Sequence, residues 1–297
     1  MVARRFAQVV WLPVIALILA VAGAQLHAGA PRNEANAVPL RLEDDGVITV
    51  QANINGDGPF RLLLDTGSNR SAVSSQVARR MRLAAVARTT AVSATGKRDR
   101  AVVRLDALSL GNITKRELLV AVLDEEGRAA LGAGLDGILG QDFLLGETYT
   151  LDYEHRRLIW EADRSSRGDL TRLTLKEEEG RWLVALPQRQ DGTDVLWFVP
   201  DSGASALVVF DRGTPLTLSL MPLPSCAMTR TATGSAVMRA VQVDRLRVGS
   251  VVMRNRPAVV VDRRSPDAPA GDGLLPLSMF ESVSFDPTGS TLLVRAR

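Results

Sequence analysis

The stretch that decides the fold of this 297-residue chain is Arg61-Leu62-Leu63-Leu64-Asp65-Thr66-Gly67-Ser68, because a second version of it occurs further on. That version is Trp197-Phe198-Val199-Pro200-Asp201-Ser202-Gly203-Ala204, and it places Asp201 136 residues after Asp65. In both, a mostly apolar run ends in Asp and is followed at once by a small hydroxyl residue and Gly. Such a run is typical of a buried strand that ends in a sharp turn.

Further landmarks repeat in the same order around these two stretches. Leu135-Asp136-Gly137-Ile138-Leu139-Gly140 resembles Gly271-Asp272-Gly273-Leu274-Leu275-Pro276, again at an offset of 136. Ala94-Thr95-Gly96 matches Ala232-Thr233-Gly234 at an offset of 138. Landmarks that keep their order and nearly constant spacing indicate a tandem duplication.

Each copy is predicted to be rich in β-strands. Residues 48–54 alternate apolar and polar side chains before an Asn-Gly turn, which is typical of a half-buried strand. A short helix is expected near Ser74 or Ser75. Short strands with Gly and Pro turns favour an all-β fold with two similar closed-barrel lobes, at residues 41–162 and 172–297. Further strands are expected at 60–64, 102–110, 118–123, 182–186, 195–199, 241–246 and 259–261.

The N-terminus has the three-part order of an export signal. Arg4 and Arg5 precede an apolar run that ends in small residues, so residues 1–28 are interpreted as a signal peptide or an uncleaved membrane anchor. Residues 29–40 are interpreted as a tether. Both interpretations predict export, either to a periplasm or to the periplasmic face of an inner membrane. Contact with a membrane is expected only through this segment.

The composition disfavours several classes of function. Aromatic residues are only 4% of the chain and the formal net charge is +3, so no nucleic-acid partner is expected. Two histidines, His27 and His155, leave little material for a metal site or a Ser-His-Asp triad. The single cysteine, Cys226, excludes an intrachain disulfide. No metal and no cofactor is therefore expected.

Two strand-borne aspartates suit one particular chemistry. If the two Asp loops faced each other, the carboxyl groups of Asp65 and Asp201 would share one proton, because like charges at close range cannot both ionise easily. One carboxylate could then take a proton from a bound water while the other protonated a substrate carbonyl. This route needs neither histidine, nor a thiol, nor a metal.

The two loops resemble the catalytic loops of aspartic proteases of the pepsin and retropepsin type, with Ile138-Leu139-Gly140 similar to that family's supporting element. The resemblance covers roughly residues 41–297 and implies a bilobal endopeptidase with a cleft between the lobes. It implies Asp65 and Asp201 as the catalytic pair, supported by Thr66, Gly67, Ser202 and Gly203. It also implies an extended peptide or protein as substrate and a monomer that suffices for activity, with a homodimer as the alternative.

The chain departs from the family pattern at two prolines. Pro200 directly precedes Asp201 and removes a backbone donor, and Pro276 stands where the first copy has Gly140. These departures leave open a catalytically silent, protease-like module that binds peptides or acts as a scaffold in the cell envelope. By position, Thr95 and Gly96 in the first copy and Thr233 and Gly234 in the second are flap candidates, with plain hairpin tips as the alternative.

Overall fold

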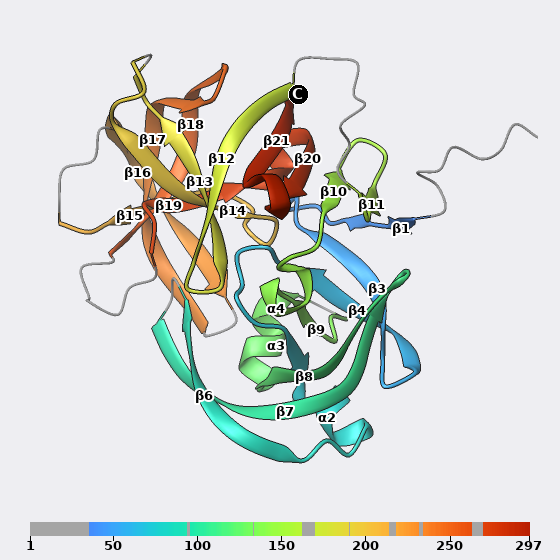
Figure 1. Ribbon diagram of the computed structural model, residues 1–297. Helices are drawn as coiled ribbons and strands as arrows, with labels where there is room; N and C mark the ends of the chain where they lie inside the picture. Colours follow the sequence, from blue (N-terminus) through green and yellow to red (C-terminus); the bar gives the residue numbers. More distant parts are fainter. Residues whose placement is uncertain are drawn as a thin grey trace, which may run out of the picture.

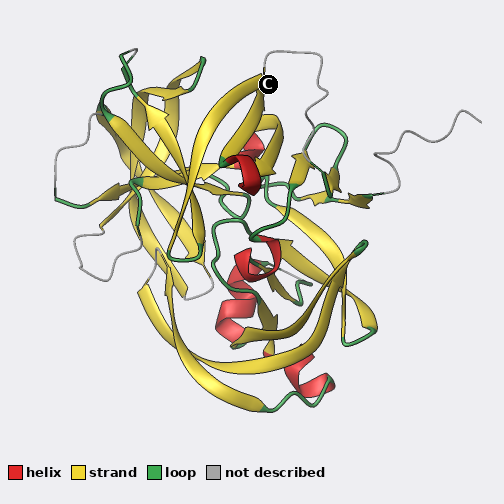
Figure 2. Ribbon diagram, in the orientation of Figure 1, coloured by secondary structure: helices red, strands yellow, loops and turns green. Residues whose placement is uncertain are grey.

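The structure, a computed structural model, describes residues 36–93, 96–132, 134–161, 170–189, 191–213, 218–231, 234–262 and 270–297. Strands dominate both halves of the chain, and the few helices are short (Figure 2). The blue-to-green half forms one lobe and the yellow-to-red half forms the other (Figure 1). The predicted all-β, two-lobe fold is confirmed.

The first lobe is built on a sheet with the strand order β2-β3-β4-β9-β5-β8-β7-β6 within the described residues. Strand β4 carries the apolar run before Asp65 and pairs in parallel with β9, the supporting element. Leu62 and Leu64 of β4 are buried, which fixes the strand that positions Asp65. The bounds are Arg41–Leu42 (β2), Ile48–Ile54 (β3), Asp57–Leu64 (β4), Ala72–Ser74 (β5), Ala85–Ser93 (β6), Gly96–Leu110 (β7), Ile113–Leu123 (β8) and Gly137–Leu139 (β9).

The second lobe repeats this arrangement strand for strand. Its part of the larger sheet runs β12-β13-β14-β19-β15-β18-β17-β16, and β14 pairs in parallel with β19 as β4 does with β9. The duplication that the sequence predicts is therefore present in the topology. The bounds are Leu170–Glu178 (β12), Arg181–Pro187 (β13), Val195–Asp201 (β14), Leu207–Asp211 (β15), Leu220–Thr231 (β16), Gly234–Val248 (β17), Val251–Asp262 (β18) and Gly273–Pro276 (β19).

Five strands join the two lobes in one continuous sheet of order β1-β11-β10-β20-β21-β12. β10 of the first copy pairs antiparallel with β20 of the second, and the rings of Tyr149 and Phe285 stack there with centroids 4.7 Å apart. Because backbone pairing and aromatic packing both cross this boundary, the lobes are held together as one unit. The bounds are Ala37–Pro39 (β1), Tyr149–Asp152 (β10), Arg157–Ile159 (β11), Phe280–Asp286 (β20) and Thr291–Ala296 (β21).

The N-terminal tether differs from its prediction over its last residues. Ala37–Pro39 form β1 and pair with β11, and Val38 and Leu40 are buried. Two apolar side chains that alternate with polar or exposed positions give this short segment a face to bury, so it joins the sheet edge. Residues 1–35, which hold the predicted leader, lie outside the described residues.

Short helices cover parts of the sheets without building the core. The predicted helix near Ser74 is α2, Ser75–Arg80, whose N-cap is Ser74: its hydroxyl accepts a hydrogen bond from the Val77 amide. Helix α3, Glu125–Leu131, was not predicted from the sequence; Asp124 caps it in the same way. The remaining helices are α4, Gln141–Leu144, and the 3₁₀ turns η1, Leu277–Met279, and η2, Pro287–Gly289.

Candidate active site

Asp65 and Asp201 meet where the two lobes join. Asp65 directly follows β4 and Asp201 is the last residue of β14, and the two carboxyl groups share a hydrogen bond. Asp201 is buried, with 7% of its surface exposed, whereas Asp65 is partly exposed. The structure thus brings together the two aspartates that the sequence analysis singled out.

The glycines after the two aspartates make this close approach possible. A Cβ atom on Gly67 would overlap the carboxyl group of Asp201, and one on Gly203 would lie 2.7 Å from the Asp65 carboxyl carbon. In both positions a side chain would be too close to the opposite carboxyl group. Gly67 and Gly203 are therefore required because the opposite carboxyl group occupies the space of a side chain.

Backbone amides hold each carboxyl group in place. The amides of Gly67 and Ser68 both donate to Asp65 Oδ1 at 3.0 Å. On the other side the Gly203 amide donates to Asp201 Oδ1 at 2.8 Å. Each amide orients a carboxyl group and favours its charged form, so the arrangement is prepared to hold negative charge at the junction.

Thr66 and Ser202 lock the two loops together by exchanging hydrogen bonds. The Thr66 hydroxyl donates to Pro200 O at 2.7 Å and accepts from the Ser202 amide at 2.9 Å. In mirror image, the Ser202 hydroxyl donates to Leu64 O at 2.7 Å and accepts from the Thr66 amide at 3.0 Å. These four buried bonds fix the loops, and hence the two carboxyl groups, relative to each other.

Burial raises the pKa of both aspartates. Burial raises the pKa of Asp65. The hydrogen bond from Asp201, the two amides and the charge of Arg181 each lower it and so reduce this increase. The pKa of Asp201 is raised well above its ordinary value, first by burial and then by the negative charge of Asp65. Because the two carboxyl groups lie this close together, they share one proton and ionise in two separate steps.

Pro200 is accommodated without loss of the second loop. The antiparallel ladder between β13 and β14 ends at Phe198, so Pro200 lies beyond it, where a missing N–H breaks no ladder bond to β13. The carbonyl of Pro200 accepts the bond from Thr66 described above. Asp201 also keeps its amide partner, Gly203.

Pro276 makes the two supporting elements unequal. In the first copy the Gly140 amide donates to Ser71 Oγ at 2.9 Å, and Gln141 Nε2 donates to Thr66 O at 2.8 Å. The corresponding residues of the second copy are Pro276, which has no amide proton, and Leu277, which has no polar side chain. The side chain of Gln141 therefore supports the Asp65 loop through its bond to Thr66 O. Gln141 was not singled out from the sequence.

Asp136 and Asp272 hold the strands that carry the dyad. Asp136 accepts from the Arg61 amide at 2.9 Å, and Asp272 accepts from the Trp197 amide at 2.8 Å. Both aspartates precede a glycine on which a Cβ would overlap a backbone carbonyl oxygen of β5 or β15. The repetition of this Asp-Gly pair at an offset of 136 is the sequence signal for its strand-fixing role.

The flap candidates lie at the tips of two long hairpins. Gly96 is the first residue of β7, opposite Ser93, and Gly234 is the first residue of β17, opposite Thr231. Thr95 and Thr233 lie outside the described residues. Helix α3 of the first lobe lies against the β16–β17 hairpin of the second, so the second hairpin reaches across the lobe boundary.

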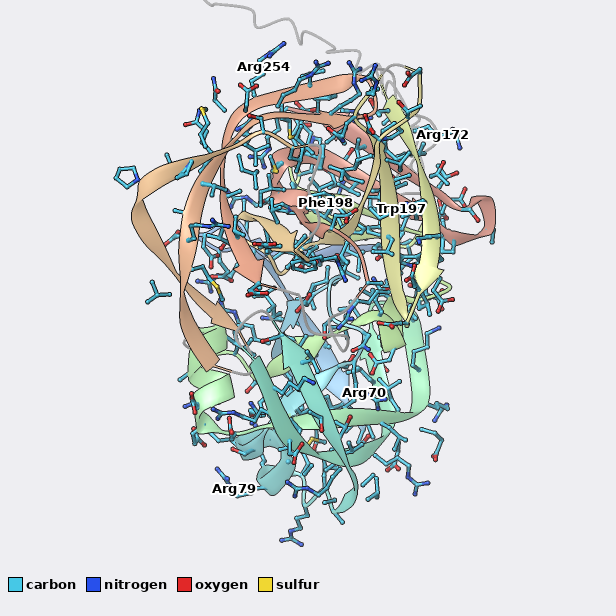
Figure 3. The ribbon with its side chains drawn as sticks, turned by 90° about the vertical axis from the view of Figure 1, so that its left-hand side faces the viewer. Arg70, Arg79, Arg172, Trp197, Phe198 and Arg254 are labelled. Carbon is cyan, nitrogen blue, oxygen red and sulfur yellow. The ribbon has the colours of Figure 1, made fainter. Side chains whose placement is uncertain are left out.

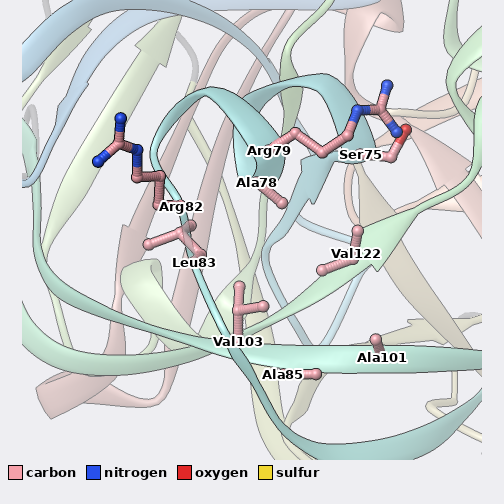
Figure 4. A pocket seen from close by; sticks show the side chains of 9 residues that line it. All are labelled: Ser75, Ala78, Arg79, Arg82, Leu83, Ala85, Ala101, Val103 and Val122. Atoms are coloured by element: carbon pink, nitrogen blue, oxygen red, sulfur yellow. The ribbon is translucent and has the colours of Figure 1, made fainter.

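A separate groove lies on the first lobe, away from the dyad. Ala78, Leu83, Val103 and Val122 give it an apolar floor, and Arg79 of α2 and Arg82, which follows α2, also line it (Figure 4). Within the described part of the chain, no three His, Cys, Asp or Glu side chains group closely enough to hold a metal ion. No described helix has the length and apolar character needed to cross a membrane.

Comparison with known families agrees with this geometry. A family model described as aspartyl protease matches residues 50–143 and again residues 187–279, together more than half of the chain. Each match contains one Asp loop and its supporting element, so the tandem repeat is confirmed at the level of the family. No curated protein matches the chain.

Proposed function

Because the chain belongs to the aspartyl protease family, which supports a protease-like function, we propose that it is an endopeptidase that uses Asp65 and Asp201 as a catalytic dyad. One observation carries the proposal: the two carboxyl groups share a hydrogen bond at the junction of the lobes, and each accepts from its own loop amide. Paired carboxyl groups with separated pKa values are the arrangement that acid–base hydrolysis by two aspartates needs.

The difference between the two aspartates assigns their roles in the proposed reaction. Asp65, which is partly exposed and has the charge of Arg181 near it, acts as the base: it takes a proton from a water as the water oxygen bonds to the carbonyl carbon of the scissile peptide. Asp201 gives its proton to the carbonyl oxygen, so the product of this step is a neutral tetrahedral diol. Asp65 then gives its proton to the peptide nitrogen while Asp201 takes a proton from one hydroxyl of the diol, so the C–N bond breaks, an amine and a carboxylic acid are released, and both aspartates regain their starting states.

The substrate we propose is an extended segment of peptide or protein, bound by a single copy of this chain. Asp65, Gly67 and Gly203 are partly exposed, so the dyad is reachable from solvent. Extended segments satisfy their backbone groups by pairing with strand edges, which suits the long β6–β7 and β16–β17 hairpins. We also propose export to a periplasm, either free or anchored, on the basis of the leader-like residues 1–28.

The test is cleavage of an unstructured protein such as casein by the purified protein, with fragments identified by mass spectrometry. Asp65→Asn and Asp201→Asn should each lower turnover at least about 1000-fold, because each removes one ionisable partner of an acid–base pair. The matched control is Asp44→Asn, since Asp44 is an exposed aspartate of the first lobe. A statine-type transition-state mimic should inhibit the wild type.

Two results would count against the proposal. Undiminished cleavage by either dyad variant would exclude the shared-proton mechanism. A wild-type protein that binds peptides without cleaving them would instead support the silent binding module. No observation on the described residues favours that module over the protease.

A further inference from the structure

Arg181 lies at the tip of the hairpin between β12 and β13 and contacts the active-site loop of the opposite lobe. Its Nε donates to Gly67 O at 3.0 Å. The turn before it passes through Glu179 and Gly180 with positive φ angles of 53° and 71°, and a Cβ on Gly180 would lie 3.7 Å from Asn69 Cβ. The hairpin tip is therefore packed against the loop that holds Asp65.

The hydrogen bond to Gly67 O continues through a single peptide unit to the dyad. The carbonyl of Gly67 and the amide of Ser68 belong to the same peptide group, and that amide donates to Asp65 Oδ1 at 3.0 Å. A donor that polarises a peptide carbonyl strengthens the bond given by the amide of the same peptide. Arg181 is thus connected to one carboxyl group of the pair by two hydrogen bonds in series.

The duplicated fold shows that this contact exists on one side only. Val50 pairs with Leu62, and Val184 pairs with Phe198, where Leu62 and Phe198 each stand three residues before their aspartate. Counting back three residues from Val50 and Val184 equates Val47 with Arg181. Val47 is buried and uncharged, so the pair of loops receives a positive charge from only one of its two equivalent positions.

No salt bridge neutralises this charge among the described residues. The hydrogen bond of Arg181 to Gly67 O uses Nε, and its terminal nitrogens have no hydrogen-bond or ion-pair partner in the part of the chain described. The acidic groups in its field are Asp65, then Glu179, then Asp201. Tyr153, from the turn after β10, also faces Asp201; burial raises its pKa, and the charge of Arg297 acts on it in the opposite direction. The half-buried guanidinium of Arg181 thus acts on both aspartates of the dyad.

We propose that Arg181 is a positioning residue that makes the dyad unequal, holding the negative charge on Asp65 and leaving the shared proton on Asp201. This inference rests on the proposed protease function. It explains how two loops related by duplication, with closely matching hydrogen bonds, acquire different roles as base and acid. The asymmetry comes from a residue of the second lobe that acts on the aspartate of the first.

The experiment compares four variants of the full chain with the wild type. Arg181→Gln keeps an N–H donor for Gly67 O but removes the charge, and Arg181→Met is a second neutral variant. Arg181→Lys restores a charge. Arg172→Gln is the matched control, because it removes one positive charge from an exposed position of β12, where Figure 3 shows Arg172 near the rim of the second lobe. Each variant is checked for folding by circular dichroism.

The principal readout is the pH dependence of kcat/KM for one peptide substrate. Loss of the cation should move the acidic limb, which reports protonation of Asp65, to higher pH by about one unit in both neutral variants. Arg181→Lys should return the limb most of the way to the wild-type value, and Arg172→Gln should leave it unchanged. A lower rate with an unmoved acidic limb in a folded neutral variant would overturn the proposal.

A second readout does not depend on turnover. Titration of ¹³C-labelled aspartate carboxyl groups by NMR should show the same upward shift for the first-ionising member of the dyad in Arg181→Gln. If the wild type cleaves no peptide, the protease proposal fails while this titration still tests Arg181. If the wild type cleaves and the titration is unchanged, the protease proposal stands and the inference on Arg181 fails.

Discussion

Replacing Thr66 by Val tests whether the exchange of hydrogen bonds between the loops holds the two lobes in register. Valine has nearly the same shape as threonine, so the substitution removes the hydroxyl group without opening a cavity. Thr66 is fully buried, and its hydroxyl serves two buried backbone groups, Pro200 O and the Ser202 amide. Both groups would lose their partner and find no water in exchange.

The expected loss of stability follows from these two groups. A buried polar group left without a partner costs roughly 1–3 kcal/mol, so Thr66→Val should lower the free energy of unfolding by about 3 kcal/mol. Ser202→Ala should have a similar effect, because the Ser202 hydroxyl makes the mirror-image pair of bonds to Leu64 O and the Thr66 amide. Thr66→Ser keeps the hydroxyl and loses one methyl group, which costs about 1 kcal/mol.

The assay is urea unfolding followed by circular dichroism and by tryptophan fluorescence, with coincident curves required before a free energy is derived. The double variant Thr66→Val/Ser202→Ala should be destabilised by less than the sum of the two single changes, since the four bonds form one connected set. The reasoning is refuted if Thr66→Val changes stability by less than about 0.5 kcal/mol. It is also refuted if Thr66→Ser is as damaging as Thr66→Val.

Two further predictions concern the dyad and its brace. Burial raises the pKa of Asp201 in the folded state, whereas its value in the unfolded chain is about 4. The wild type should therefore lose stability relative to Asp201→Asn as the pH rises from about 4 through the folded-state pKa. Urea midpoints of both proteins at pH 4 and pH 7 measure this loss, and a difference in midpoint that stays the same at both pH values would contradict the prediction. Gln141→Leu, which copies the residue at Leu277, should cost about 1–3 kcal/mol in urea unfolding because Thr66 O loses its donor; an unchanged stability would show that the brace contributes nothing.

Local pattern was enough to predict the repeat and the strands that carry the two aspartates. Leu62 and Leu64 before Asp65, and Phe198 and Val199 before Asp201, are buried, as an apolar run implies. The helix at Ser74 was also predictable, because a capping side chain acts on amides only a few residues away. Sequence pattern did not predict every helix. It missed α3, whose cap Asp124 has the same form but precedes a stretch without a clear apolar face.

Sequence by itself thus determined which residues form each Asp loop, since strand, turn and glycine are close neighbours along the chain. Only the tertiary structure decided how the loops differ. The Thr66–Ser202 exchange joins residues 136 positions apart, Gln141 reaches Thr66 across 75, and Arg181 reaches Gly67 across 114. Periodicity and spacing carry no information on such contacts, because they depend on how two separately formed lobes pack. That packing places Arg181 on the loop of Asp65, whereas the equivalent position of the first lobe holds Val47.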